Sequence, residues 1–82
     1  MRVARKNVVD TFLSANPQHA IEVEAWLDTA AAAAWSSDSD VAAAFPAASN
    51  SGAIWVFLLK SGVLIEAIVT YSPGVVSIRK VS

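Results

Sequence analysis

The sequence predicts an α+β domain of two layers, with helices packed on one face of a small antiparallel sheet. Three observations lead to this prediction. Apolar residues recur at helical spacing before Pro46, they alternate with other residues along three segments after Gly52, and turn residues separate those segments. Helices that precede a run of strands are typical of α+β domains. The 82 residues are expected to form one domain, residues 1–82.

The first part of the chain is expected to form an edge strand and two helices. Arg2–Ala4 is a short strand, and Arg5 to about Ala15 is an amphipathic helix because apolar residues recur there at helical spacing. These apolar residues are Val8, Val9, Phe12 and Leu13. Asn16-Pro17 begins a second helix that runs to about Ala34, since Asn is a good N-cap and Pro suits the first helical position.

A polar segment separates the second helix from a short third one. Ser37 and Asp40 approximate a capping box, in which two side chains satisfy free backbone N–H groups at a helix start. The third helix carries Val41–Phe45 and ends before Pro46, which cannot continue a helix. The small residues of Ala47–Gly52 are expected to form a loop.

Three strands are expected after this loop, joined as an antiparallel meander. They are Ile54–Leu59, Val63–Tyr71 and Val75–Val81. Ser61-Gly62 forms the first turn and Ser72-Pro73-Gly74 the second, where Pro followed by Gly is typical of a type II turn.

The apolar stretch Ala53–Tyr71 is long enough to suggest a membrane helix instead of a hairpin. Lys60 and Glu66 interrupt it, and a charge near the bilayer centre costs several kcal/mol. We therefore expect a hairpin and no membrane insertion. No unbroken apolar segment follows the basic Met1–Asn7, so no signal peptide is predicted and a cytoplasmic location is expected.

The composition argues against several kinds of site. The chain has no cysteine, and its single histidine, His19, is expected to face solvent in the first turn of the second helix. No metal and no cofactor are therefore expected. The net charge is −1, and no Lys or Arg lies between Lys6 and Lys60 although six acidic residues do. Because RNA-binding surfaces usually show clustered Lys and Arg, we expect weak or no nucleic-acid binding.

Five short motifs occur along the chain. They are Met1-Arg2-Val3, Asn16-Pro17-Gln18-His19, Ala44-Phe45-Pro46-Ala47, Val56-Phe57 and Ile78-Arg79-Lys80-Val81. In this order and at about this spacing they resemble the HigB branch of the RelE-like toxins, which are ribosome-dependent mRNA endonucleases of bacterial toxin–antitoxin pairs. The resemblance implies a RelE/HigB-like fold, with helices on one face of a small twisted sheet, and an antitoxin as a partner.

The resemblance also indicates which residues would act on RNA. Arg79 matches the arginine near the end of the family's last strand. Lys60 falls in a turn where relatives often have Gly or a polar residue, so its match is loose. Ile65 and Ser36-Ser37 stand where the family has an arginine and two lysine-rich positions, and the family's final Thr-His-x-Glu-Tyr segment would begin where this sequence stops, at Ser82. Phosphate cleavage by a ribose 2′-hydroxyl needs a base, an acid and cations. We therefore expect no nuclease activity, with Arg79 and Lys60 as remnants.

Two sets of residues are candidates for binding a partner. In the second expected strand of the meander, Leu64, Glu66 and Ile68 share one face, and exposed apolar area on a small sheet often marks a partner site. The alternative is that they lie in a second core beneath the N-terminal segment. Trp26 and Trp35 raise the same question, because tryptophans are enriched at binding hot spots but also form cores.

These observations favour a protein-binding module that inhibits or modulates another protein. The association of toxin–antitoxin families with plasmids and prophages suggests a phage or mobile-element protein that acts on a host target. The alternative is a HigB-type mRNA endonuclease neutralised by an antitoxin, and a third hypothesis is a decoy that sequesters an antitoxin. The functional form is expected to be a homodimer or a complex with a protein partner, assembled through the sheet.

Overall fold

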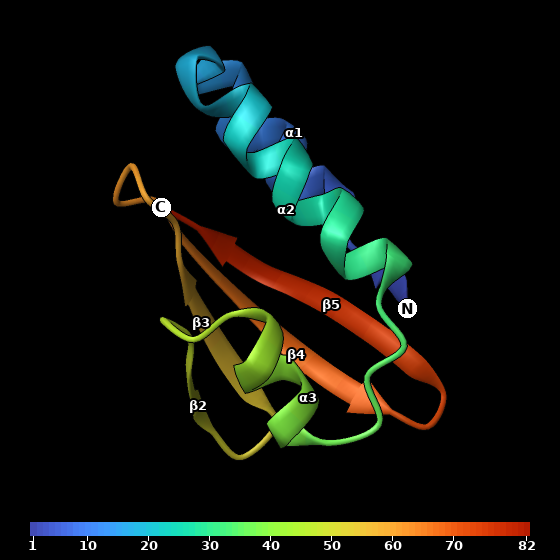
Figure 1. The fold of residues 1–82 in the computed structure, drawn as a ribbon. Coiled ribbons are helices and arrows are strands. Elements are labelled where there is room, and N and C mark those ends of the chain that lie inside the picture. The colour runs from blue at the N-terminus through green and yellow to red at the C-terminus, as the bar shows by residue number, and fades with distance from the viewer.

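A five-stranded sheet is the layer on which the rest of the chain packs. In the computed structural model, which describes residues 1–82, the strand order is β1-β5-β4-β3-β2 (Figure 1). The strands are β1 Arg2–Ala4, β2 Ser49–Ser51, β3 Ile54–Leu58, β4 Leu64–Tyr71 and β5 Gly74–Val81. β4 pairs antiparallel with both β3 and β5, which confirms the predicted meander and the hairpin within Ala53–Tyr71.

The sheet is mixed, and the prediction of a wholly antiparallel sheet was wrong at one edge. β1 runs parallel to β5, with Arg2 opposite Val75 and Ala4 opposite Ser77. No hairpin joins these two strands, because the whole length of the domain lies between them in sequence, so nothing in the local pattern sets their relative direction.

Two connections also differ from the predictions. Ser49–Ser51, expected to lie in a loop, forms the short strand β2 and pairs antiparallel with β3, after which Gly52 takes a positive φ of 62° in the turn. Glycine adopts this conformation without a steric cost. The Ser72–Pro73 peptide bond is cis, and Tyr71 pairs with Gly74. Pro73 therefore occupies the third position of the turn, whereas the predicted type II turn has Pro in the second position.

The helices are α1 Lys6–Ala15, a 3-10 turn η1 Pro17–His19, α2 Ala20–Ala32 and α3 Asp38–Ala44. Asn16 does not cap the second helix as expected. Its backbone N–H and its side-chain Nδ2 both donate to the Phe12 carbonyl, at 2.9 and 3.0 Å, so Asn16 closes the end of α1 instead. α2 ends two residues earlier than predicted, because Ala33 already has an extended backbone.

The expected capping box of Ser37 and Asp40 does not form at the start of α3. Ser37 is the N-cap residue, but its side chain makes no capping hydrogen bond. Asp40 instead accepts hydrogen bonds from the backbone N–H of Ser36 at 2.9 Å and from the Ser36 hydroxyl at 3.0 Å. These bonds lower the pKa of Asp40, because they favour its charged form.

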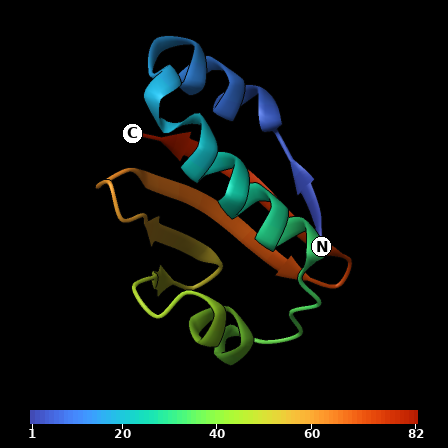
Figure 2. The ribbon, with the colours of Figure 1, turned by 45° about the horizontal axis from the view of Figure 1, so that its top comes forward.

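The hydrophobic core lies between the helices and one face of the sheet. Figure 2 shows α2 crossing in front of β5. Aromatic rings form the centre of the core: the ring centroids of Trp26 and Phe57 are 5.1 Å apart, and those of Phe45 and Phe57 are 5.2 Å apart. Aliphatic residues surround them, namely Val9, Val23, Val41, Ile65, Val69, Val76 and Ile78. No helix has the length and apolar composition that a membrane span requires.

Hydrogen bonds connect the helical layer to the sheet at three places. The Ser61 backbone N–H donates to Glu22 at 3.1 Å and the Ser61 hydroxyl donates to the same carboxylate, so α2 is tied to the β3–β4 turn. The Tyr71 hydroxyl donates to Asp38 and so ties β4 to α3. The amino group of Met1 donates to the Ala31 and Ala33 carbonyls at the end of α2.

Candidate functional site

The two faces of the sheet differ sharply in what covers them. In β4, Ile65, Ala67 and Val69 are buried beneath the helices, whereas Leu64 and Thr70 are exposed. This alternation confirms the predicted division of the strand into two faces. We call the side that faces away from the helices the open face.

Apolar side chains gather on the open face in cross-strand pairs. Ile54 lies opposite Ile68, Val56 opposite Glu66, and Leu58 opposite Leu64. The apolar residues of this face, which we call the apolar patch, are Ile54, Val56, Leu58, Leu64, Ile68 and Val75. None of them belongs to the core or packs against it, and Leu58 and Leu64 are 51% and 39% exposed. The N-terminal segment therefore does not cover Leu64 and Ile68 with a second core.

A β-bulge places two adjacent cations on the open face. Glu66 is opposite Lys80 and Ala67 is opposite Ile78, so Arg79 is an extra residue in β5. As a result Arg79 and Lys80 are both exposed, although successive strand residues normally point to opposite faces. The Arg79 Nε atom lies 3.6 Å from the Glu66 carboxylate.

The parallel pairing of β1 brings three more cations to the same edge of the sheet. Ala4 is opposite Ser77, so Arg5 and Lys6 begin α1 beside the residues that precede Arg79, and Arg2 lies about four residues, or roughly 13 Å, further back along β5. We call this group the cationic edge: Arg2, Arg5, Lys6, Arg79 and Lys80. All five are exposed, and the sixth cation of the chain, Lys60, lies elsewhere.

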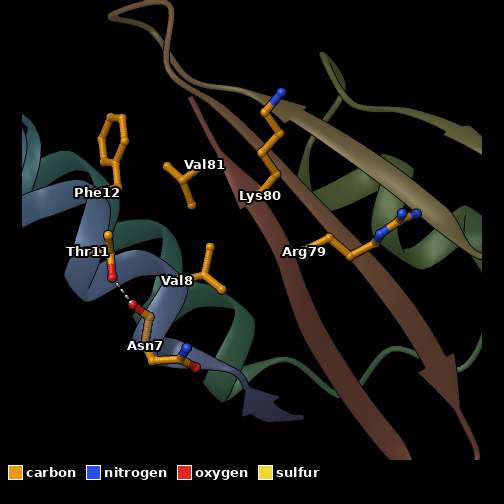
Figure 3. A pocket seen from close by; sticks show the side chains of 7 residues that line it. All are labelled: Asn7, Val8, Thr11, Phe12, Arg79, Lys80 and Val81. Carbon is orange, nitrogen blue, oxygen red and sulfur yellow. Dashed lines mark hydrogen bonds between the residues drawn. The ribbon is translucent and has the colours of Figure 1, made fainter.

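A shallow hollow of about 320 Å³ lies between α1 and the end of β5 (Figure 3). Its lining residues are Asn7, Val8, Thr11, Phe12, Arg79, Lys80 and Val81. In Figure 3 the Arg79 side chain extends away from α1, while Val81 points toward it. The cationic groups therefore do not converge into the hollow, and their charge is presented along the edge of the sheet instead.

The other residues singled out in the sequence lie away from the open face. Trp26 and Trp35 are buried in the core, at 3% and 8% exposure, so a surface role for their rings does not fit this placement. Lys60 lines a second hollow of about 320 Å³ with Glu22 and Trp26, beneath α2, and does not meet Arg79. His19, expected to face solvent, is half-buried and stacks on Phe12 with ring centroids 6.0 Å apart.

The arrangement offers binding groups and no converging set of acid, base and nucleophile. Arg79 is paired with Glu66, and Ile65, at the position where the resemblance leads one to expect an arginine, is fully buried. No group of three or more His, Asp or Glu side chains is placed to hold a metal ion. What the site can do chemically is cover apolar surface and pair with carboxylates or phosphates.

Sequence reasoning found part of this site and missed the rest. Leu64, Glu66 and Ile68 follow from strand alternation, and the same alternation in Ile54–Leu58 would have added Ile54, Val56 and Leu58. The cationic edge left no local signal, because its members are separated by most of the chain. No protein-family model and no curated protein matches the sequence.

Proposed function

We propose that this protein is a binding module without nuclease activity, which acts by covering part of another protein with the open face of its sheet. The observation that carries the proposal is the apolar patch, whose six side chains neither belong to the core nor pack against it. Apolar surface gains roughly 25 cal/mol per Å² when it leaves water, so a partner that covers the patch is stabilised by this burial. Patches of this kind on small domains often mark interaction sites.

The edge strands are poorly suited to pairing with a strand of another protein. β1 and β2 have three residues each, and β2 consists of Ser49, Asn50 and Ser51. Short, polar edge strands discourage pairing with another chain. The open face, in contrast, presents side chains from three adjacent strands, β3, β4 and β5.

The resemblance to HigB-like toxins supplies the proposed setting. A toxin-like scaffold that has lost its catalytic groups retains a surface on which binding can be built, because function resides in sites and not in folds. We propose a cytoplasmic protein of a phage or mobile element that inhibits or modulates a host protein, with a homodimer as the alternative assembly. A HigB-type mRNA endonuclease with an antitoxin partner is the second candidate, and the cationic edge is the observation that favours it.

The proposal is tested by removing the apolar patch without touching the core. Wild-type protein and a variant with Leu64→Lys and Ile68→Lys are used to capture partners from the native host, and captured proteins are identified by mass spectrometry. Each candidate is then purified and its affinity measured by calorimetry. We expect the double variant to keep the wild-type circular dichroism spectrum and to weaken binding at least about tenfold, or 1.4 kcal/mol.

Ile21→Lys is the matched control, because Ile21 is 87% exposed on α2 and also becomes a lysine. It should bind as the wild type does. If the double variant unfolds, the two residues stabilise the core and the proposal fails. If it folds and binds normally, the interface lies elsewhere. Light scattering of the free protein shows whether the partner is a second copy.

A further inference from the structure

The open face has two halves of different chemistry. Its β3–β4 half carries five of the six residues of the apolar patch, and its β1–β5 half carries Arg2, Arg79 and Lys80 together with the sixth, Val75, on the same side of the sheet. Arg2 shares this side because its strand partner, Val75, faces away from the helices. Adjacent strands are about 4.8 Å apart, so the centres of the two halves are separated by roughly 10 to 14 Å.

We propose that the cationic edge binds a short acidic segment of the partner protein, next to the apolar residues that the patch covers. This inference rests on the proposed function and specifies the chemistry of the partner. The partner segment carries several carboxylates and, about three to five extended residues away, several large apolar side chains, because an extended chain advances about 3.3 Å per residue. Such a segment crosses the strands and contacts both halves.

The distribution of charge supports an acidic segment. Five of the six Lys and Arg residues lie on the cationic edge, and on the open face only Glu66 offsets them. Lys80 has no ion-pair partner within the chain, and neither do Arg2, Arg5 and Lys6. These four exposed cations are available for pairing across an interface, where charge complementarity mainly sets orientation and association rate.

The same distribution argues against a long polyanion. The helical layer carries six acids, Asp10, Glu22, Glu24, Asp28, Asp38 and Asp40, and the net charge of the chain is −1. A nucleic-acid strand carries one phosphate charge every few ångströms and extends beyond the cationic edge, where these acids repel it. A peptide with its charges confined to a few residues meets only the cationic edge. A second copy of this chain is also disfavoured, because two open faces bring like charges together.

The test compares synthetic probes of defined composition. A fluorescein-labelled peptide of three glutamates, a Gly-Ser-Gly spacer and three leucines is titrated with the protein, and its anisotropy is measured. A matched peptide has glutamines for the glutamates, and decauridylate represents nucleic acid. At about 50 mM salt the glutamate peptide should bind about tenfold more tightly than the glutamine peptide, and the difference should shrink at about 300 mM salt.

Variants of the protein locate the effect. Arg2→Ser with Lys80→Ser should weaken the glutamate peptide about five- to tenfold, because it removes two unpaired cations from the edge. Lys60→Ser leaves Arg79 and Lys80 unchanged and is the control for an exposed cation elsewhere. It should change the affinity less than about twofold. Equal effects of both variants would show nonspecific charge attraction and overturn the proposal.

The outcomes also separate this inference from the proposed function. If neither peptide binds, or if the glutamate and glutamine peptides bind equally, the proposal of an acidic segment is wrong. If decauridylate binds more tightly than the glutamate peptide, the cationic edge is assigned to nucleic acid. A neutral variant with Leu64→Gln and Ile68→Gln tests the apolar half. If the wild-type protein binds the two peptides equally and this variant binds neither, the apolar patch is a binding surface and only the proposal of an acidic segment is wrong. If it binds the glutamate peptide normally, the cationic edge stands and the apolar patch fails.

Discussion

Arg79 lies across the open face from Glu66, with 3.6 Å between its Nε atom and the nearer carboxylate oxygen, and this is the only ion pair of the molecule. Both side chains are partly exposed, at 42% and 35%. An exposed ion pair contributes little to stability, typically about 0 to 1 kcal/mol, because water and salt screen it. We expect its larger effect to be on binding, since Glu66 offsets the charge of Arg79 on the open face.

Glu66→Gln should therefore strengthen the binding of an acidic segment. The substitution releases Arg79 and makes the open face more positive by one charge, so the glutamate peptide should bind about two- to fivefold more tightly. The free energy of unfolding, measured in urea, should change by less than about 1 kcal/mol. Glu24→Gln makes the same change of charge on α2 and is the control. Equal gains from both variants would contradict a local effect of Glu66.

Substitutions in neighbouring residues of β4 should differ strongly in their effect on stability. Ile65 is fully buried, so Ile65→Ala removes packed surface and leaves a cavity, at a cost of about 2 to 5 kcal/mol. Leu64 is 39% exposed on the open face, and Leu64→Ala should cost roughly 1 kcal/mol or less. Chemical denaturation followed by circular dichroism measures both. A reversed order would place the core on the other face of the sheet.

Tyr71 should titrate at an unusually high pH. Burial, together with the hydrogen bond to Asp38 and the negative charge of that carboxylate, raises the pKa of Tyr71 to about 12. Tyr71 is the only tyrosine, so the absorbance change near 295 nm reports it alone. Because the folded-state pKa exceeds the unfolded value of about 10, the stabilising contribution is present below pH 10 and decreases as the pH rises toward 12. Asp38→Asn should lower the pKa, and a titration near 10 in the folded wild type would contradict the contact.

Purified protein should not cleave mRNA on ribosomes. The resemblance matches one arginine of the family, at Arg79, and that side chain is paired with Glu66. Ile65, which stands at the position of a second arginine, is buried. Charge stabilisation at the phosphate and a positioned acid and base are both needed for this reaction. Primer extension on ribosome-bound message measures cleavage. Site-specific cleavage that Arg79→Ala abolishes would establish the endonuclease instead.

The parts of the fold that the sequence predicts are those set by local pattern. Helical spacing predicts α1, and alternation with Ser61-Gly62 as a turn predicts the β3–β4 hairpin, because side-chain periodicity follows directly from backbone geometry. Polar contacts at helix ends were less predictable. Asn is a residue type favoured at helix N-caps, but the side chain of Asn16 donates to the Phe12 carbonyl at the end of α1 instead.

The candidate site divides along the same line. Leu64 and Ile68 are predicted from alternation alone. One face of β4 packs against the helices, so the alternate residues lie on the other face. The cationic edge depends on the pairing of β1 with β5, which joins the two ends of the chain, and on the bulge at Arg79, which turns Lys80 outward. A long-range pairing and a one-residue irregularity both lie outside what local periodicity reports.

Arg5 allows a final test in which stability and binding should change in opposite directions. Its backbone is left-handed, with φ 62° and ψ 40°, a conformation that glycine adopts freely and other L-residues adopt at a cost. Arg5→Gly should therefore raise the free energy of unfolding by roughly 0.5 to 1 kcal/mol, while the lost charge weakens the glutamate peptide about two- to fivefold. Arg5→Ala removes the same charge but keeps the strain, so it should show the loss of binding without the gain in stability. Denaturation in urea and peptide anisotropy measure the two effects, and unchanged binding in both variants would remove Arg5 from the cationic edge.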